Sequence, residues 1–304
     1  MAEAVIVSAV RTPIGRANKG VLKDVRADDL AAIAVRAAVE RVPQLDRSLI
    51  EDVILGCAFP EGEQGMNLAR LVGALAGLPE TAAGVTVNRF CASSLQAFNM
   101  AAQNIMLDMG DAFVAGGVES MSRVPMGGFN PSFNPRLIKT DGDEKANSPY
   151  PPCELEYAYS SYIPMGMTAE NLARKYQIGR EAQDAFALRS HQRAIAATDN
   201  GIFKREIVPV PLPDGRVMEI DEGPRRDTSL EKLASLEPAF IKGGTVTAGN
   251  SSPLNDGASA VVLMSAERAR DLGITPLAKV HSMAVAGVDP AFMISGTQFQ
   301  AASI

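Results

Sequence analysis

The chain has 304 residues, of which 46% are hydrophobic and 21% are charged, and its net charge is −6 at pH 7. These values are typical of a soluble globular protein with room for more than one domain, and the negative charge excludes the basic footprint of a nucleic-acid-binding protein. No apolar run is long enough to span a bilayer, so we expect no membrane span. Three cysteines without paired spacing argue against a disulfide framework and predict a reducing, cytoplasmic location. The two histidines lie far apart, so no metal-ligand cluster is visible.

Strand and helix patterns alternate through the N-terminal part of the chain. The first apolar run has no basic residue before it, so it is typical of a buried strand and not of a signal peptide. Elements that alternate at this spacing indicate a layered α/β fold. The predicted elements are strands over Ala4–Val10, Val53–Cys57 and Asp111–Gly117, and helices over Asp28–Val42 and Asn67–Leu75.

The stretch Val85–Met109 places a cysteine at a predicted strand-to-helix junction. Val85–Val87 is a β-branched run that predicts a short buried strand, and apolar residues recur at helical spacing after Cys91. Backbone N–H groups at a helix N-terminus favour negative charge, so a thiolate there is stabilised. Cys91 is therefore a candidate nucleophile, and the alternative is that it packs as a small hydrophobe. The apolar helix positions are Leu95, Phe98, Ala102, Ile105 and Met106.

The amino-acid composition of the sequence changes after Ser122. Pro, Gly, Asn and Ser dominate residues 125–152, which predicts long loops. One helix is expected to begin after Thr168, which is its predicted N-cap. A second is expected over Arg180–Thr198, where His191 is predicted to be a surface or packing histidine.

Three later segments follow in chain order. Asp221–Phe240 begins with charged residues and then predicts a short helix. By residue type alone, its two adjacent arginines, Arg225 and Arg226, are expected to be solvated at the surface. Gly244–Ala260 is rich in turn formers, which predicts strand, turn and strand. Ala258–Met264 is apolar and predicts a buried strand.

Several segments resemble the thiolases, enzymes that transfer acyl groups between an enzyme thiol and coenzyme A. Asn88–Ala97, NRFCASSLQA, resembles their nucleophile motif. VIVSAVRTPIG near the N-terminus, GGVESMS from Gly116 and TVTAGNSSPLNDGA from Thr245 resemble other family segments. The Asn-Arg pair before Cys91, and Pro164 where biosynthetic relatives often have His, indicate the degradative 3-ketoacyl-CoA thiolase / acetyl-CoA acetyltransferase type.

This resemblance implies an α/β, thiolase-like layered αβα fold made of two similar halves. Residues 1–121 and 245–270 would form the N-terminal half, residues 122–244 a loop domain covering the CoA site, and residues 271–304 an incomplete start of the C-terminal half. Leu277–Val288 would be the first strand of that second half. The Asn-Glu-Ala-Phe, Gly-His-Pro and Cys-x-Gly-Gly-Gly motifs of the family are absent from the sequence. We therefore expect a C-terminally truncated thiolase.

The resemblance also implies roles for individual residues. Cys91 would be the nucleophile, with its own N–H as part of an oxyanion hole. Ser252 would contact pantetheine, and Arg225 (or, as a weaker candidate, Arg226) the nucleotide end of CoA, where a guanidinium can bind phosphate. Asn255–Gly257 would hold the shape of the loop. The family uses CoA and acyl-CoA as substrates, needs no metal or redox cofactor, and pairs as homodimers or homotetramers.

The implied function is that of an acyl-CoA acyltransferase in fatty acid β-oxidation and lipid metabolism. It would cleave 3-ketoacyl-CoA with CoA through an acyl-thioester intermediate on Cys91, although the His and second Cys motifs of the family catalyst are missing from the sequence. The alternative is a non-catalytic thiolase fragment that retains dimerisation and weak CoA binding. A third hypothesis is a condensing enzyme of the same architecture with carrier-bound substrates, which the Asn-Arg pair and the NDGA segment disfavour.

Overall fold

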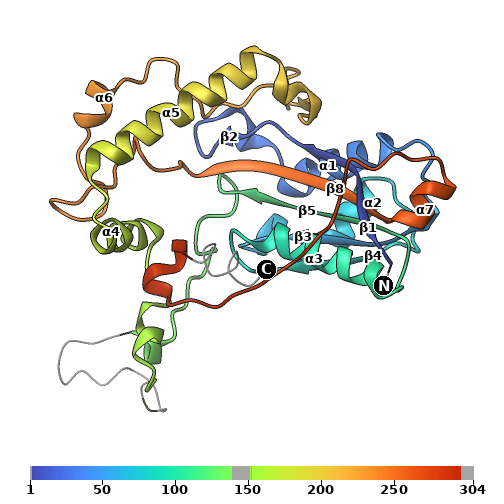
Figure 1. Ribbon diagram of the computed structural model, residues 1–304, viewed down its shortest axis with the longest axis horizontal. Helices are drawn as coiled ribbons and strands as arrows, with labels where there is room; N and C mark the ends of the chain where they lie inside the picture. Colours follow the sequence, from blue (N-terminus) through green and yellow to red (C-terminus); the bar gives the residue numbers. More distant parts are fainter. Residues whose placement is uncertain (1, 139–150, 152, 296–304) are drawn as a thin grey trace. The chain divides into compact units, whose positions relative to one another are not determined.

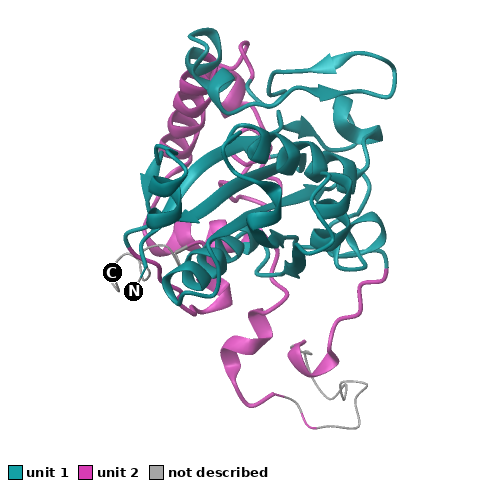
Figure 2. Cartoon of the chain, turned by 90° about the vertical axis from the view of Figure 1, so that its right-hand side faces the viewer, with its two compact units in different colours: residues 1–129, 196–224, 253–281 teal, residues 130–195, 225–252, 282–304 magenta. Residues whose placement is uncertain are grey.

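The computed structural model describes residues 2–138, 151 and 153–295. These residues form two compact units (Figure 2). Unit 1 comprises the described residues within 1–129, 196–224 and 253–281, and unit 2 those within 130–195, 225–252 and 282–304. These units are defined by contacts within the chain. The division into an N-terminal half, a loop domain and an incomplete C-terminal half is a different one and stays a prediction.

Unit 1 is built on a mixed β-sheet (Figure 1). Its main strands are β1 (Ala4–Arg11), β3 (Ile50–Gly56), β4 (Ala83–Val87), β5 (Ala112–Ser120), β8 (Asn255–Ser265) and β9 (Ala278–Lys279), and the short β2 (Gly15–Arg16) pairs with β8. The order is β4-β3-β5-β8-β1-β9. The strands β3, β4 and β5 are parallel, and β8 is antiparallel to both of its neighbours. A separate ribbon joins β6 (Val210–Pro211) to β7 (Val217–Met218).

Helices cover both faces of this sheet (Figure 1). On one face α1 (Ala27–Glu40) packs beside α2 (Leu68–Leu75), and on the other lies α3 (Ser93–Met106). The buried stripe of α1 includes Leu30, Ala34 and Ala38, the spacing of an amphipathic helix that covers a core. The short α7 (Ala266–Asp271) follows β8 directly.

Unit 2 contains the helices α4 (Met165–Lys175) and α6 (Leu230–Ala234) and most of α5 (Arg180–Asp199). The predicted N-cap at Thr168 is wrong, because α4 begins three residues earlier. Pro164 has an extended conformation, and its carbonyl oxygen accepts from the N–H groups of Met167 and Thr168. Thr168 is buried inside the helix, where its Oγ1 donates a hydrogen bond of 2.7 Å to the carbonyl oxygen of Met165.

Most predicted elements are confirmed, with ends that differ by a few residues, but three expectations need correction. Of the strand expected over Leu277–Val288, only β9 forms, paired with β1 at the edge of the sheet. The described residues of Gly244–Ala260 form no strand before Asn255. Val85–Val87 is half-buried rather than buried, because β4 is the other edge strand of the sheet.

Candidate active site

Cys91 lies in the turn between β4 and α3, at the strand-to-helix junction that its sequence predicts. The strand ends at Val87 and the helix begins at Ser93. The Cys91 side chain is exposed, so within the described residues it does not pack as a small buried hydrophobe. Among the hydrogen bonds of the described residues, the backbone N–H of Cys91 donates to no protein acceptor. This N–H therefore remains available for an oxygen atom of a ligand.

The turn before Cys91 has an uncommon backbone conformation. Phe90 has φ +46°, in the left-handed region that costs a residue with a large side chain on the order of 1 kcal/mol or more. Two side chains stabilise it. Asn88 Oδ1 accepts a hydrogen bond of 2.8 Å from the Phe90 N–H. Ser93 Oγ accepts one of 2.8 Å from the Arg89 N–H and donates one of 2.5 Å to the Phe90 carbonyl oxygen. The local sequence thus holds the turn that presents Cys91.

Two glycines let the first turn of α3 approach the carboxyl ends of β3 and β5. A Cβ atom at Gly56 would lie 2.3 Å from Ser93 C and Ser94 N. A Cβ atom at Gly117 would lie 2.1 Å from Ser94 Oγ. Only glycine permits such contacts at either position, so these two residues fix where Cys91 lies. Ligands of parallel α/β sheets bind at this edge, beyond the carboxyl ends of the strands.

A partly buried polar cluster lies at the same edge of the sheet. Glu119 of β5 accepts hydrogen bonds from Gln64 Nε2 (2.7 Å) and from the Ala58 N–H (2.8 Å). Gln64 Nε2 also lies 3.3 Å from Cys57 Sγ. Burial, with the nearby Glu119 charge as a second cause, raises the pKa of the Cys57 thiol to about 12. Cys57 is therefore an unreactive thiol in the folded protein.

The sequence alone did not predict roles for Gln64, Asn88 or Glu119. Two of them lie in segments with a visible signal, because Asn88 opens the nucleophile motif and Glu119 stands within GGVESMS. The partners of Glu119, Gln64 and Ala58, are 55 and 61 residues away in the chain. Such contacts depend on strand pairing, which sequence spacing alone does not show.

Asp256 anchors the turn that follows β5. It is fully buried and lies in β8 rather than in a loop. Its carboxylate accepts hydrogen bonds from the Ser122 N–H (2.9 Å) and from Ser122 Oγ (2.5 Å). Asp256 therefore fixes the turn after β5 from within a strand, whereas the prediction for Asn255–Gly257 is that they hold the shape of their own loop.

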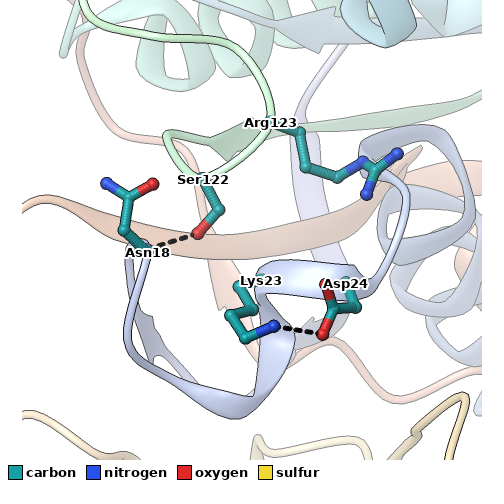
Figure 3. A pocket seen from close by; sticks show the side chains of 5 residues that line it. All are labelled: Asn18, Lys23, Asp24, Ser122 and Arg123. Carbon is teal, nitrogen blue, oxygen red and sulfur yellow. Dashed lines mark hydrogen bonds and ion pairs between the residues drawn. The ribbon is translucent and has the colours of Figure 1, made fainter.

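Ser122 also borders a polar hollow of about 400 Å³ in unit 1 (Figure 3). The hollow is lined by Asn18, Lys23, Asp24, Ser122 and Arg123. Lys23 pairs with Asp24 and Arg123 with Glu63. Because both cations already have a carboxylate partner, the hollow offers a bound anion no unpaired positive charge.

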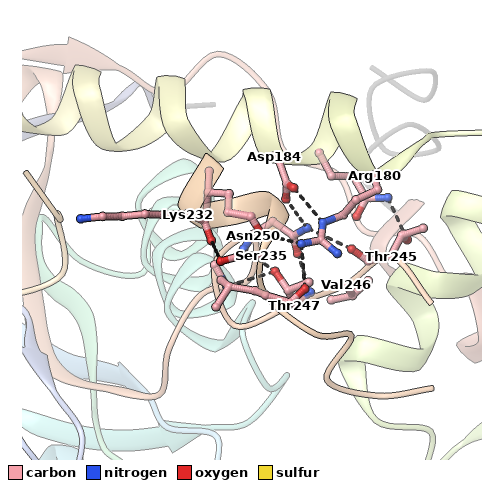
Figure 4. Close-up of polar contacts among 12 residues, drawn as sticks. Arg180, Asp184, Lys232, Ser235, Thr245, Val246, Thr247 and Asn250 are labelled. Atoms are coloured by element: carbon pink, nitrogen blue, oxygen red, sulfur yellow. Dashed lines mark hydrogen bonds and ion pairs between the residues drawn. The ribbon is translucent and has the colours of Figure 1, made fainter. Parts of the chain in front are cut away.

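In unit 2, a polar network fixes the segment that carries Ser252 (Figure 4). Asn250 Oδ1 accepts a hydrogen bond of 2.7 Å from the Thr247 N–H, and Asn250 Nδ2 donates one of 3.0 Å to Asp184. Asp184 is buried and also accepts from Arg180 Nε at 2.7 Å. Ser252 is exposed at the end of this segment. Its contact with pantetheine stays a prediction.

Arg225 is exposed in the same unit. Its backbone N–H donates a hydrogen bond of 3.1 Å to Nδ1 of the half-buried His191, which agrees with the surface or packing position predicted for that histidine. Arg226 is exposed as well. Arg225 and Ser252 thus belong to unit 2 and Cys91 to unit 1, and the CoA contacts of both unit 2 residues stay predictions.

Within the described ranges, no three His, Cys, Asp or Glu side chains gather as a metal ion would require. Over the same ranges, every helix is too short or too polar to cross a membrane.

Comparisons with known proteins identify the family. Residues 4–267 match the family described as Thiolase, N-terminal domain. The 3-ketoacyl-CoA thiolase of Bacillus subtilis is 49% identical over 305 residues, which cover 96% of this chain and 73% of the relative. The 3-ketoacyl-CoA thiolase of Marinobacter nauticus is 47% identical, with 96% of this chain and 71% of the relative covered.

Solved structures agree with these matches. An acetyl-CoA acetyltransferase from Syntrophomonas wolfei superposes with a TM-score of 0.82 at 42% identity, covering 97% of this chain and 72% of that structure. Human mitochondrial 3-ketoacyl-CoA thiolase in complex with CoA gives 0.82 at 36% identity, covering 96% and 72%. The predicted thiolase-like α/β fold is confirmed, and the chain belongs to the thiolase family.

Proposed function

We propose that the chain is an acyl-CoA acyltransferase that cleaves 3-ketoacyl-CoA with CoA through an acyl-enzyme on Cys91. The observation that carries this proposal is the geometry of the Cys91 turn. An exposed thiol stands beside its own unpartnered N–H, directly before the N-terminus of α3. Relatives named 3-ketoacyl-CoA thiolase, and one such structure solved with CoA, support the substrate class.

In the first half-reaction the Cys91 thiolate attacks the C3 keto carbon of the substrate. A C–S bond forms, and the carbonyl electron pair moves to the oxygen atom, to which the Cys91 N–H donates a hydrogen bond. When the carbonyl group re-forms, the bond between C2 and C3 breaks. The electron pair stays on C2 of the departing acetyl-CoA, which takes up a proton.

In the second half-reaction the thiolate of free CoA attacks the acyl-enzyme carbonyl carbon, and the Cys91 thiolate leaves. Ser252 and Arg225 are the proposed CoA contacts, through pantetheine and phosphate respectively. The proposal takes CoA and acyl-CoA as substrates and includes no metal or redox cofactor. It also includes a homodimer or homotetramer, a cytoplasmic location and a role in fatty acid β-oxidation, all of which rest on the family resemblance.

A second candidate is a non-catalytic thiolase-family protein that dimerises and binds CoA weakly. One observation favours it. Among the described residues no histidine forms a hydrogen bond with Cys91, and the sequence has no Gly-His-Pro motif that would supply one. General acid–base help contributes typically ~10²–10⁴ in rate. This candidate predicts that CoA thioesters bind and that no acyl group reaches Cys91.

Intact-mass spectrometry after incubation with acetoacetyl-CoA distinguishes the two candidates. The acyltransferase proposal expects an acetyl adduct of about 42 Da on the chain, formed by attack of the thiolate on the keto carbon. The matched control is Cys91→Ser, which leaves Cys57 and Cys153 in place and should carry no adduct. Folded wild-type protein without an adduct would contradict the proposal and leave the second candidate.

A further inference from the structure

We propose that Asn88 and Glu119 are positioning residues for the Cys91 nucleophile, with Glu119 acting through the backbone of Ala58 and the side chain of Asn88. This inference rests on the proposed function, because it concerns how Cys91 is presented for acyl transfer. All of these residues lie in unit 1. Hydrogen bonds join Glu119 to Ala58, Ala58 to Asn88, and Asn88 to Phe90, the residue before Cys91.

The carboxamide of Asn88 joins two backbone segments. Its Oδ1 accepts from the Phe90 N–H at 2.8 Å, and its Nδ2 donates to the Ala58 carbonyl oxygen at 2.9 Å. A backbone N–H requires an acceptor and a carbonyl oxygen requires a donor, so these partners fix which way the amide points. An aspartate would place an oxygen against the Ala58 carbonyl, and a serine is too short to reach it. The site therefore requires both ends of an asparagine side chain.

The Ala58 backbone is itself fixed from the opposite side. Its N–H donates a hydrogen bond of 2.8 Å to Glu119 Oε2. Glu119 Oε1 accepts from Gln64 Nε2 at 2.7 Å. Gln64 is completely buried, and its Oε1 accepts from the Ser120 N–H at 2.7 Å. Both carboxylate oxygens of Glu119 thus have partners on rigid backbone or on a buried side chain, so Ala58 offers Asn88 a stationary acceptor.

The end of this series is the residue before the nucleophile. Phe90 has φ +46°, and its N–H is held by Asn88. Rotation of this peptide unit would redirect the next N–H, that of Cys91, which is the proposed oxyanion donor. Catalytic groups must be held within about 0.5 Å of the productive geometry, and a misplacement of about 1 Å can cost ~10²-fold in rate. Asn88 therefore affects acyl transfer without touching the substrate.

The experiment compares two reactions of the same thiol in the 304-residue chain. Iodoacetamide alkylation requires only an accessible thiolate, whereas acylation by acetoacetyl-CoA also requires the oriented N–H. We expect Asn88→Ser, whose hydroxyl can still accept from the Phe90 N–H, to lower the limiting acylation rate on the order of 10–100-fold. Its alkylation rate and half-saturating acetoacetyl-CoA concentration should stay within about twofold of wild type. Asn104→Ser, near the other end of α3, is the matched control.

A double-mutant cycle tests the proposed route from Glu119. If Glu119 acts through Asn88, Glu119→Gln should lower the limiting acylation rate, and the double variant should be no slower than Asn88→Ser alone. A double variant whose fold-loss equals the product of the two single fold-losses would overturn that route. A wild-type acylation rate in Asn88→Ser would overturn the positioning role. Equal losses of alkylation and acylation, or a lost melting transition in both single variants, would also overturn it, because they indicate general damage. Wild-type protein that forms no adduct would instead contradict the proposed function itself, and this inference with it.

Discussion

Gly56 and Ser93 are in such close contact that a Cβ atom at Gly56 would lie 2.3 Å from the carbonyl carbon of Ser93. The end of β3 and the start of α3 therefore meet through backbone atoms, and neither side can yield by a side-chain rotation.

We predict that Gly56→Ala destabilises the protein by about 1–3 kcal/mol, because the methyl group must displace the first turn of α3. It should also slow acylation of Cys91, which precedes that turn. Thermal melting and the intact-mass assay measure the two effects. Gly223→Ala is the control, because no atom lies within 4 Å of the position that its methyl group would take. Equal melting temperatures for both variants would contradict the prediction.

Cys57 and Cys91 should differ in reactivity. Burial raises the pKa of the Cys57 thiol to about 12, whereas Cys91 is exposed. Iodoacetamide at pH 8 should therefore modify Cys91 in the native protein and Cys57 only after unfolding, as peptide mapping would show. Modification of Cys57 at the rate of Cys91 in native protein would refute this prediction.

The same pKa shift predicts a loss of stability at high pH. The folded protein favours the neutral Cys57 thiol, so this contribution is complete below the unfolded pKa of about 8.5 and is lost as pH rises toward 12. Denaturant melts of wild type and Cys57→Ala should therefore converge between about pH 8.5 and 12. A stability difference that stays constant over this range would be the contrary result.

Glu63 should stabilise unit 1 in a pH-dependent way. It accepts hydrogen bonds from Arg123 Nε at 2.6 Å and Arg26 Nη1 at 3.1 Å. The hydrogen bond from Arg123 is the main cause that lowers the pKa of its carboxyl group. A lowered pKa means that the stabilisation is present above the unfolded pKa of about 4.3 and is lost as pH falls.

We therefore expect Glu63→Gln to cost about 1 kcal/mol at pH 7, since its arginine partners are partly exposed. The difference from wild type should shrink below about pH 4.3. Denaturant melts across pH measure it, with the exposed Glu80→Gln as the control. A difference that grows in acid would be the wrong sign for this mechanism.

In unit 2, Asp184→Asn should weaken both stability and CoA binding. Asp184 is buried and joins Arg180 to Asn250, so removing its charge leaves a guanidinium without its carboxylate. The expected loss is about 2–4 kcal/mol. Because Asn250 holds the segment that carries Ser252, CoA titrations should show weaker affinity. The exposed Glu181→Gln on the same helix should change neither quantity, and tight CoA binding by Asp184→Asn would separate this network from the CoA site.

Local signals account for what could be predicted from the sequence. Apolar periodicity predicts α1 and β1, and a cysteine between strand and helix patterns predicts the place of Cys91, all of which depend on neighbours in the chain. Leu95 shows the limit of this method. It has helical spacing with Ala102 and Ile105 but is 56% exposed, because periodicity shows which residues share a face and not what covers that face.

Contacts between distant residues could not be predicted in this way. The partners of Glu119 come from the segment after β3, and Asp256 contacts Ser122 from a strand 134 residues away. Family motifs marked several of these residues as special without indicating their partners. The N-cap prediction for α4 failed for a local reason. The extended residue Pro164 precedes the first residue of the helix, so α4 begins before Thr168, the more common type of capping residue.

The position of β8 has a consequence for how the protein is made. This strand separates β1 from β5 in the sheet, yet it begins at Asn255, long after β5 ends at Ser120. During translation, both β1 and β5 therefore leave the ribosome with an edge that has no partner until residue 265 follows. Unpaired strand edges promote aggregation, so both edges stay open to wrong pairing for the time that the ribosome takes to add the intervening residues.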